Sequence, residues 1–186
     1  TLNVLDAARL AGATRVAVVT SADIYGPVTE AELPLTEQQP LRPVSPYAAS
    51  KAAADMLCVQ AGLGHGFDVI RIRAFNHLGP GQSDKFVASA LARRVARAER
   101  NREATVRVGN LEARRDFTDV RDVVRAYRAL MADGCPGQAY NVCSGIDRSV
   151  RELAGILLRN SSSDITLETD PELMRPVDLK VLRGDN

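Results

Sequence analysis

Arg15 to Ser21 reads RVAVVTS, a short β-branched run with little polar alternation. Strands with this pattern are covered on both faces, as in a parallel sheet. Residues 47 to 63 (YAASKAAADMLCVQAGL) have helical composition, and Asp68 to Arg73 (DVIRIR) supplies a second strand. Strand, helix and strand in this order form a right-handed crossover with helices packed on the sheet. The sequence therefore predicts an α/β fold built on a doubly wound parallel sheet.

The segments on either side continue the alternation. Residues 2 to 11 have helical spacing and are followed by Gly12, whereas the proline-rich stretch from Gly26 to Pro46 is typical of a long surface loop. Further along, we expect helices at 84–100, 119–131 and 149–158, and strands at 105–108, 139–143 and 164–168.

Composition excludes several classes of function. The chain of 186 residues carries 24 basic and 23 acidic residues, so it has no net positive field that would attract polyanions. With 4% aromatic residues it also has few side chains on which nucleic-acid bases could stack. No apolar stretch approaches the roughly 20 residues of a membrane span. Cys58, Cys135 and Cys143 match no metal-binding spacing. We expect a cytoplasmic protein without nucleic-acid partner, membrane segment or metal.

Tyr47 and Lys51 stand four residues apart at the start of the predicted helix and so share one helical face. A phenol with a pKa of about 10 is a spectator at neutral pH, but an adjacent cation favours its anion. The compact lysine ammonium can also bond a ribose hydroxyl. The alternative interpretation is an accidental surface pair.

Ser21 strengthens the functional interpretation because it ends the first predicted strand. Ligands of open α/β sheets bind at the carboxyl ends of strands. A hydroxyl there can bond the same carbonyl oxygen that Tyr47 would protonate.

Six segments together resemble a known family. Ser21 to Gly26 (SADIYG), Tyr47 to Lys51 (YAASK) and Arg73 to Gly81 (RAFNHLGPG) are similar to the extended short-chain dehydrogenases/reductases, in the NAD-dependent epimerase/dehydratase branch that acts on nucleotide sugars. The later segments resemble GDP-mannose 4,6-dehydratases and, more closely, GDP-4-dehydro-6-deoxy-D-mannose reductases; they are Gly109 to Asp119 (GNLEARRDFTD), Tyr140 to Gly145 (YNVCSG) and Glu172 to Asp178 (ELMRPVD).

The resemblance implies roles for individual residues. It places the catalytic groups at Ser21, Asp23, Tyr47 and Lys51. It places contacts to NADP or NAD at Tyr47, Lys51, Phe75 and His77, and contacts to a nucleotide sugar at Asn76, Arg115 and Arg175. The alternative for His77 is a structural role in a tight turn, and the alternative for each arginine is a surface ion pair. Arg114, next in the sequence, could take the substrate-binding role instead of Arg115.

The resemblance also predicts how the chain is divided. Residues 1–80 are expected to form the C-terminal half of a Rossmann-like dinucleotide-binding domain, and residues 81–186 a small α/β part that mainly binds the nucleotide sugar, with segments returning to the cofactor domain. No GxGxxG spacing opens the chain, so we expect a fragment, incomplete at its N-terminal half and inactive alone.

The activity implied is reduction of a GDP-4-keto-6-deoxyhexose at C4, with Tyr47 as proton donor and a product such as GDP-D-rhamnose. A GDP-mannose 4,6-dehydratase is the first alternative, although Ala22 and the short Asp23 fit it less well. A non-catalytic nucleotide-sugar-binding protein is the second. The resemblance also implies a homodimer, formed through the Tyr47 helix, with its Ala-rich face at 48–54, and the helix at 84–100 or at 2–11.

Overall fold

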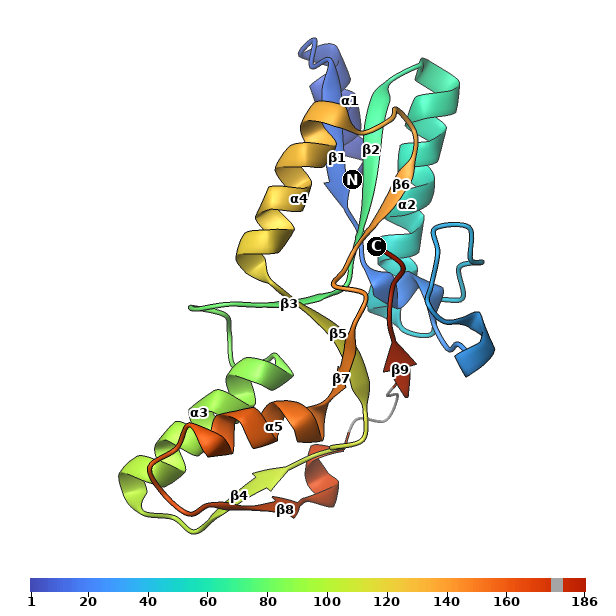
Figure 1. Cartoon of the computed structure of the whole chain (residues 1–186). Coiled ribbons are helices and arrows are strands. Elements are labelled where there is room, and N and C mark those ends of the chain that lie inside the picture. Colours follow the sequence, from blue (N-terminus) through green and yellow to red (C-terminus); the bar gives the residue numbers. More distant parts are fainter. Residues whose placement is uncertain (175–178) are drawn as a thin grey trace. The chain divides into compact units, whose positions relative to one another are not determined.

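The repeat predicted around RVAVVTS is present in the computed structural model, which describes residues 1–174 and 179–186 (Figure 1). β1 (Arg15–Val19), α2 (Pro46–His65) and β2 (Asp68–Ala74) follow one another along the chain, and β6 (Ala139–Val142) lies beside β2. These three strands are parallel, in the order β1-β2-β6. The predicted α/β class and parallel sheet are confirmed.

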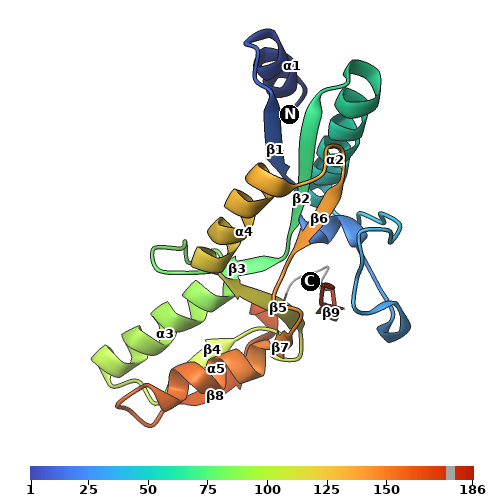
Figure 2. The same cartoon turned by 45° about the horizontal axis from the view of Figure 1, so that its top comes forward.

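Helices cover both faces of this sheet because successive strand residues point to opposite sides. Val16 and Val69 pack with Leu5 and Cys58, which come from α1 (Leu2–Leu10) and α2. Ile70 and Ile72 pack instead with residues of α4 (Val120–Asp133), and Figure 2 shows α4 on the face opposite to α1 and α2. The doubly wound arrangement therefore follows from two interleaved sets of apolar side chains.

Local sequence fixes where α2 begins and ends. The hydroxyl of Ser45 accepts a hydrogen bond from the backbone N–H of Ala48 at 3.1 Å, and Pro46 occupies the first turn, where its missing N–H costs nothing. Gly66 ends the helix in the left-handed conformation, with φ at 62°. The first turn, which carries Tyr47, is thus capped.

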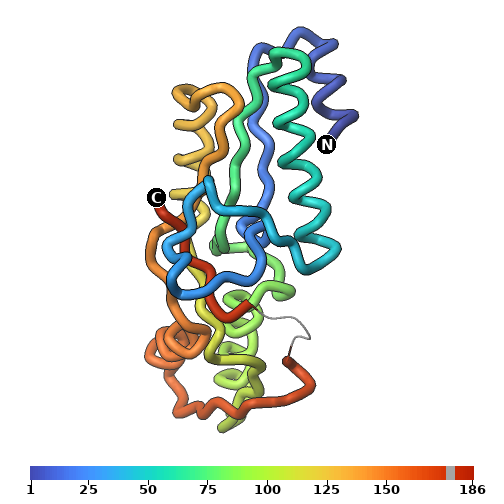
Figure 3. The backbone as a smooth tube through the Cα atoms, turned by 90° about the vertical axis from the view of Figure 1, so that its right-hand side faces the viewer, coloured from blue at the N-terminus to red at the C-terminus, as the bar shows by residue number. Residues whose placement is uncertain are grey.

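The segment between β1 and α2 is the predicted long loop, apart from the 3-10 turns η1 (Ala22–Tyr25) and η2 (Glu30–Glu32). Its middle is tied to the end of the chain, because Leu35 N donates to Arg183 O at 2.9 Å and Asp185 N donates to Leu35 O at 2.9 Å. Figure 3 shows the C-terminal segment (red) running beside this loop (blue).

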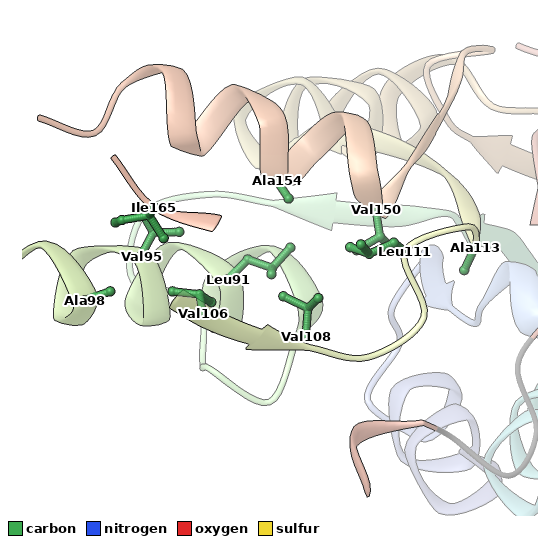
Figure 4. Close-up of a cluster of buried hydrophobic side chains, with 10 residues drawn as sticks. All are labelled: Leu91, Val95, Ala98, Val106, Val108, Leu111, Ala113, Val150, Ala154 and Ile165. Carbon is green, nitrogen blue, oxygen red and sulfur yellow. The ribbon is translucent and has the colours of Figure 1, made fainter. Parts of the chain in front are cut away.

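The chain divides into two compact units. The first contains Thr1–His77, Asp116–Ile146 and Leu182–Asn186, and the second contains Leu78–Arg115 and Asp147–Val181. The second unit is built from α3 (Val87–Asn101), β4 (Thr105–Val108), α5 (Val150–Arg159) and β8 (Thr166–Thr169), with β4 and β8 parallel. Its core is made of Leu91 and Val95 from α3, Val106 from β4 and Ala154 from α5, together with Ile165 (Figure 4).

Four short strands were not among the predicted elements: β3 (Asn76–Leu78), β5 (Arg114–Asp119), β7 (Asp147–Ser149) and β9 (Val181–Leu182). β3, β5 and β7 are neighbours in that order, and β9 pairs with β5; the remaining 3-10 turn is η3 (Pro171–Leu173). The sequence of β5, RRDFTD, is mostly charged and lacks the apolar pattern of a strand. Within the described residues, no helix has the length and apolarity needed to cross a bilayer.

Candidate functional site

Tyr47 and Lys51 lie together on α2, as their spacing predicts. The Lys51 Nζ atom is 5.9 Å from the centre of the Tyr47 ring. Tyr47 is 54% exposed, so its phenol can be reached from outside. The pair combines an accessible hydroxyl with a nearby positive charge.

Lys51 also contacts the end of β1. Its Nζ donates a hydrogen bond to the carbonyl oxygen of Val19, at 3.2 Å. Val19 is the last residue of β1 and stands two residues before Ser21. An ammonium has three protons, and Val19 is its only hydrogen-bond acceptor in the part of the chain that the structure describes. Two N–H donors of the ammonium therefore remain for acceptors on a ligand, such as hydroxyl groups.

Ser21 caps the 3-10 turn η1. Its Oγ accepts a hydrogen bond from Asp23 N at 3.2 Å, which leaves the hydroxyl proton available to an incoming carbonyl oxygen. The preceding residue, Thr20, is fixed by two bonds to Ile72 O, from its N at 2.7 Å and from its Oγ1 at 3.0 Å. The segment that carries Ser21 thus starts from a strand end that is held in place.

Gly26 ends this turn and explains the glycine of SADIYG. Its φ is 68°, a conformation that L side chains rarely adopt. A Cβ at this position would lie 1.8 Å from the carbonyl oxygen of Arg42. Only glycine lets the chain turn here and pass so close to the returning loop.

A buried ion cluster includes Asp55, which lies on the same helix as Tyr47 and Lys51. The carboxylate of Asp55 on α2 accepts from Arg71 Nη1 at 2.7 Å, and from Arg73 Nε and Nη2, each at 3.1 Å. Burial alone would raise the pKa of Asp55, but hydrogen bonds and charge from Arg73 and Arg71 lower it overall. Asp55 is therefore a carboxylate held between two guanidinium groups.

Tyr25 extends this cluster to the turn that follows Ser21. Its hydroxyl donates to Asn141 Oδ1 at 2.7 Å and accepts from Arg73 Nη1 at 3.1 Å. Burial raises the pKa of Tyr25, and the hydrogen bond from Arg73 only partly opposes it, so the phenol keeps its proton. Our sequence interpretation missed Tyr25, Arg73, Asp55 and Asn141. The available signal was Arg73, a charge inside the apolar strand DVIRIRA.

The predicted contacts Phe75, Asn76 and His77 follow the carboxyl end of β2, which is the strand next to β1. Phe75 is buried, with its ring centre 6.4 Å from that of Tyr25. Asn76 is half-buried, and His77 is exposed with Nδ1 3.2 Å from the Phe75 carbonyl oxygen. All three belong to the same unit as Ser21, Tyr47 and Lys51.

One of the two predicted substrate arginines, Arg115, belongs to a different unit from this group. Arg115 belongs to the second unit, where its Nη1 donates to Arg114 O at 2.8 Å and Leu179 O at 2.7 Å. Arg114 forms ion pairs with Asp147 and Glu152, so its guanidinium already has carboxylate partners within the protein. Arg175 lies outside the described residues.

In the described ranges, no group of three or more His, Cys, Asp or Glu side chains is placed to hold a metal ion. A concavity of about 430 Å³ is lined by Leu63, Phe67, Asp68 and Pro136, among others. It lies where β2 begins and contains none of the predicted site residues.

Comparison with known proteins agrees with the resemblance. The family model described as GDP-mannose 4,6 dehydratase matches residues 1–186. GDP-6-deoxy-D-mannose reductase of Pseudomonas aeruginosa is 40% identical over 100% of this chain and 62% of its own length. GDP-mannose 4,6-dehydratase of Sinorhizobium fredii is 28% identical over 100% of this chain and 58% of its own length.

A solved structure supports the same relationship. RMD from Pseudomonas aeruginosa complexed with NADPH is 40% identical and superposes with a TM-score of 0.91, over 99% of this chain and 62% of that one. The chain thus spans about three fifths of the length of these relatives.

Proposed function

Since the chain belongs to the GDP-mannose 4,6-dehydratase family, we propose that it forms part of an NAD(P)-dependent oxidoreductase that reduces the C4 keto group of a GDP-linked 4-keto-6-deoxyhexose. The product would be a GDP-6-deoxyhexose such as GDP-D-rhamnose. The observation that carries this proposal is the position of Lys51, whose Nζ lies 5.9 Å from the Tyr47 ring centre and bonds the carbonyl at the end of β1.

In this proposal each residue has one task. Ser21 donates a hydrogen bond from its hydroxyl to the keto oxygen and so holds the carbonyl at the end of β1. Tyr47 gives its proton to the same oxygen as negative charge develops there. Lys51 stabilises the resulting tyrosinate and offers its remaining N–H donors to the ribose next to the nicotinamide. Bound NADPH or NADH would supply the hydride.

Reduction is favoured over dehydration by the residue beside Ser21. A 4,6-dehydratase must also remove the C5 proton and expel the C6 hydroxyl, so it needs proton-transfer groups besides the tyrosine. Ala22 is buried and carries only a methyl group, and Asp23 is one methylene shorter than Glu. Placement within about 1 Å controls the rate of such steps.

We assign the cofactor to the first unit and the nucleotide to the second. The groups that fit the nicotinamide end, Tyr47 and Lys51 with Phe75 and His77, all lie in the first unit. Arg115 of the second unit and Arg175 would bind the diphosphate, because a planar guanidinium fits phosphate oxygens. Asn76 would contact the sugar diphosphate from the end of β2.

The test uses the complete gene product, purified and mixed with the GDP-4-keto-6-deoxy sugar and reduced cofactor. We expect nicotinamide absorbance to fall with turnover. Tyr47→Phe should lower kcat by about 100-fold or more, because the proton donor is lost. Tyr127→Phe, which changes another phenol on α4, is the matched control and should keep wild-type activity.

Other outcomes identify the alternatives. Turnover of GDP-mannose without net loss of reduced cofactor would establish a dehydratase. Binding of the GDP-sugar by calorimetry without any turnover would establish a binding protein. A Tyr47→Phe variant with near wild-type kcat would remove Tyr47 from the mechanism.

We further propose a cytoplasmic homodimer. All three cysteines are free thiols, which suits a reducing compartment. Met56 and Leu63 are 55% and 86% exposed on α2, and Ala49 and Ala53 on the same helix are small enough for close approach of a second copy. Light scattering on the complete gene product should give twice the chain mass, and a single-chain mass would overturn the dimer.

A further inference from the structure

We infer that the buried network of Tyr25, Arg73 and Asp55 is a positioning device that sets Ser21 against Tyr47 and Lys51. The inference rests on the proposed function, because it assigns these residues to the geometry of that catalytic group. None of the three would touch substrate or cofactor.

One end of the network holds the segment that carries Ser21. Tyr25 is the last residue of η1, the turn that Ser21 caps, and it is 1% exposed. Its hydroxyl is fixed on two sides, by Asn141 Oδ1 at 2.7 Å and by Arg73 Nη1 at 3.1 Å. Rotation or displacement of η1 would break both bonds.

The other end holds α2 in register. Asp55 follows Lys51 by four residues and Tyr47 by eight, so the three share one face of the helix. The Asp55 side chain is fully buried and takes bonds from Arg73 Nε and Nη2, each at 3.1 Å. Arg73 therefore bonds, with one planar guanidinium, the helix of Tyr47 and the turn of Ser21.

The same guanidinium also reaches the loop between these two elements. Arg73 Nη1 donates to Glu37 O at 2.8 Å. The side chain of Glu37 accepts from Asn141 N at 2.7 Å. The loop leads directly into Ser45, the cap of α2. The turn that Ser21 caps, the helix of Tyr47 and Lys51, and the loop between these two elements are thus all bonded to Arg73.

The physical chemistry favours a role in geometry over one in stability. In a buried ion cluster, the desolvation cost of the charges offsets much of the attraction between them. Apolar side chains of equal volume often stabilise a fold equally. Apolar side chains do not fix angles, however, whereas charged hydrogen bonds are directional. A network of this kind restricts η1 and α2 to one relative position.

The test removes a single hydroxyl from the complete gene product. Tyr25→Phe keeps the packing but takes one partner from Arg73 and one from Asn141. We expect kcat to fall by about 10- to 100-fold, with KM for the nucleotide sugar changed less than twofold. Tyr140→Phe is the matched control, because it also removes a hydrogen-bonded phenol hydroxyl, the one that accepts from Cys135 N at 2.8 Å. This variant should keep wild-type kcat.

A readout that needs no turnover is the NMR signal of the hydroxyl-bearing carbon of Tyr47, in protein labelled with 13C-tyrosine and assigned by its loss in Tyr47→Phe. It should move in Tyr25→Phe and stay in place in Tyr140→Phe. Arg73→Lys keeps the charge but lacks the fork that bonds Asp55 and Tyr25 together, and it should give the same result.

The outcomes separate this inference from the proposed function. If Tyr25→Phe and Arg73→Lys are less stable but keep wild-type kcat and an unmoved Tyr47 signal, the network is structural only and the inference is wrong. If the wild-type protein does not reduce the keto sugar, the proposed function fails, and the Tyr47 signal alone then decides whether the network positions that phenol.

Discussion

Burial suppresses the ionisation of two of the three thiols. It raises the pKa of Cys58 to about 11, with the negative charge of Asp55 as a further cause. It raises the pKa of Cys143 to about 12, with Asp116 contributing in the same direction. The folded-state pKa values of both thiols lie above the ordinary 9.0, so the folded state favours the protonated thiols. The contribution of these protonated thiols to stability is complete below pH 9 and is lost as pH rises through 11 and 12.

We therefore predict selective labelling of Cys135, the exposed thiol. A brief pulse of iodoacetamide at pH 8 should modify Cys135 while Cys58 and Cys143 react about 100-fold more slowly, because only the thiolate attacks. Peptide mass mapping measures the three rates. In denaturant the three rates should become similar, and a Cys58 that reacts as fast as Cys135 in the folded protein would contradict the prediction.

Among the elements, those with local signals were predictable from sequence. α2 was expected at 47–63 and runs over Pro46–His65, because its cap, its proline and its terminal glycine are neighbours in the chain. The same holds for Tyr47 and Lys51, whose spacing on one helix brings them together. Their mutual placement needs no information from the rest of the fold.

β5 shows what local patterns do not contain. Asp116 lies in the middle of RRDFTD and is fully buried. Its carboxylate accepts from Ser144 N at 2.7 Å, Ser144 Oγ at 2.6 Å and Gly145 N at 2.9 Å. These partners come from a segment nearly thirty positions away, and neighbouring residues give no indication of them. The contact of Lys51 with Val19 and the Tyr25 network likewise join residues that are distant in the sequence, so local patterns do not predict them.

Removal of the Asp116 carboxylate should destabilise the loop that follows β6. Asp116→Ala removes the charged acceptor of the half-buried donors of Ser144 and Gly145, so we predict that the free energy of unfolding falls by about 2 kcal/mol. Urea denaturation measures it. Asp122→Ala removes the acid of the surface pair with Arg125 and should cost less than about 1 kcal/mol. Equal costs for the two variants would show that the Asp116 bonds contribute no more than a surface pair.

At the scale of the molecule, the chain has separate cores. The first unit buries apolar residues on both faces of β1, β2 and β6. The second unit has its own cluster, centred on Leu91, Val95 and Ala154. Segments with independent cores can open independently, each with its own free energy. We propose that one unit binds the cofactor and the other the nucleotide. Independent opening would then let one unit change conformation around its ligand while the other unit remains folded.

Leu91→Ala tests that independence. Leu91 is 2% exposed in the second core, and its truncation should cost about 3 kcal/mol through the lost contacts and the cavity. We predict faster amide hydrogen exchange in residues 78–115 and 147–174, measured by mass spectrometry, with little change in β1, β2 and β6. Ile70→Ala, a cavity of similar size beneath β2, should give the reverse pattern. If either variant accelerates exchange equally in both units, they open as one, and a ligand bound to one unit must then stabilise the other by the same free energy.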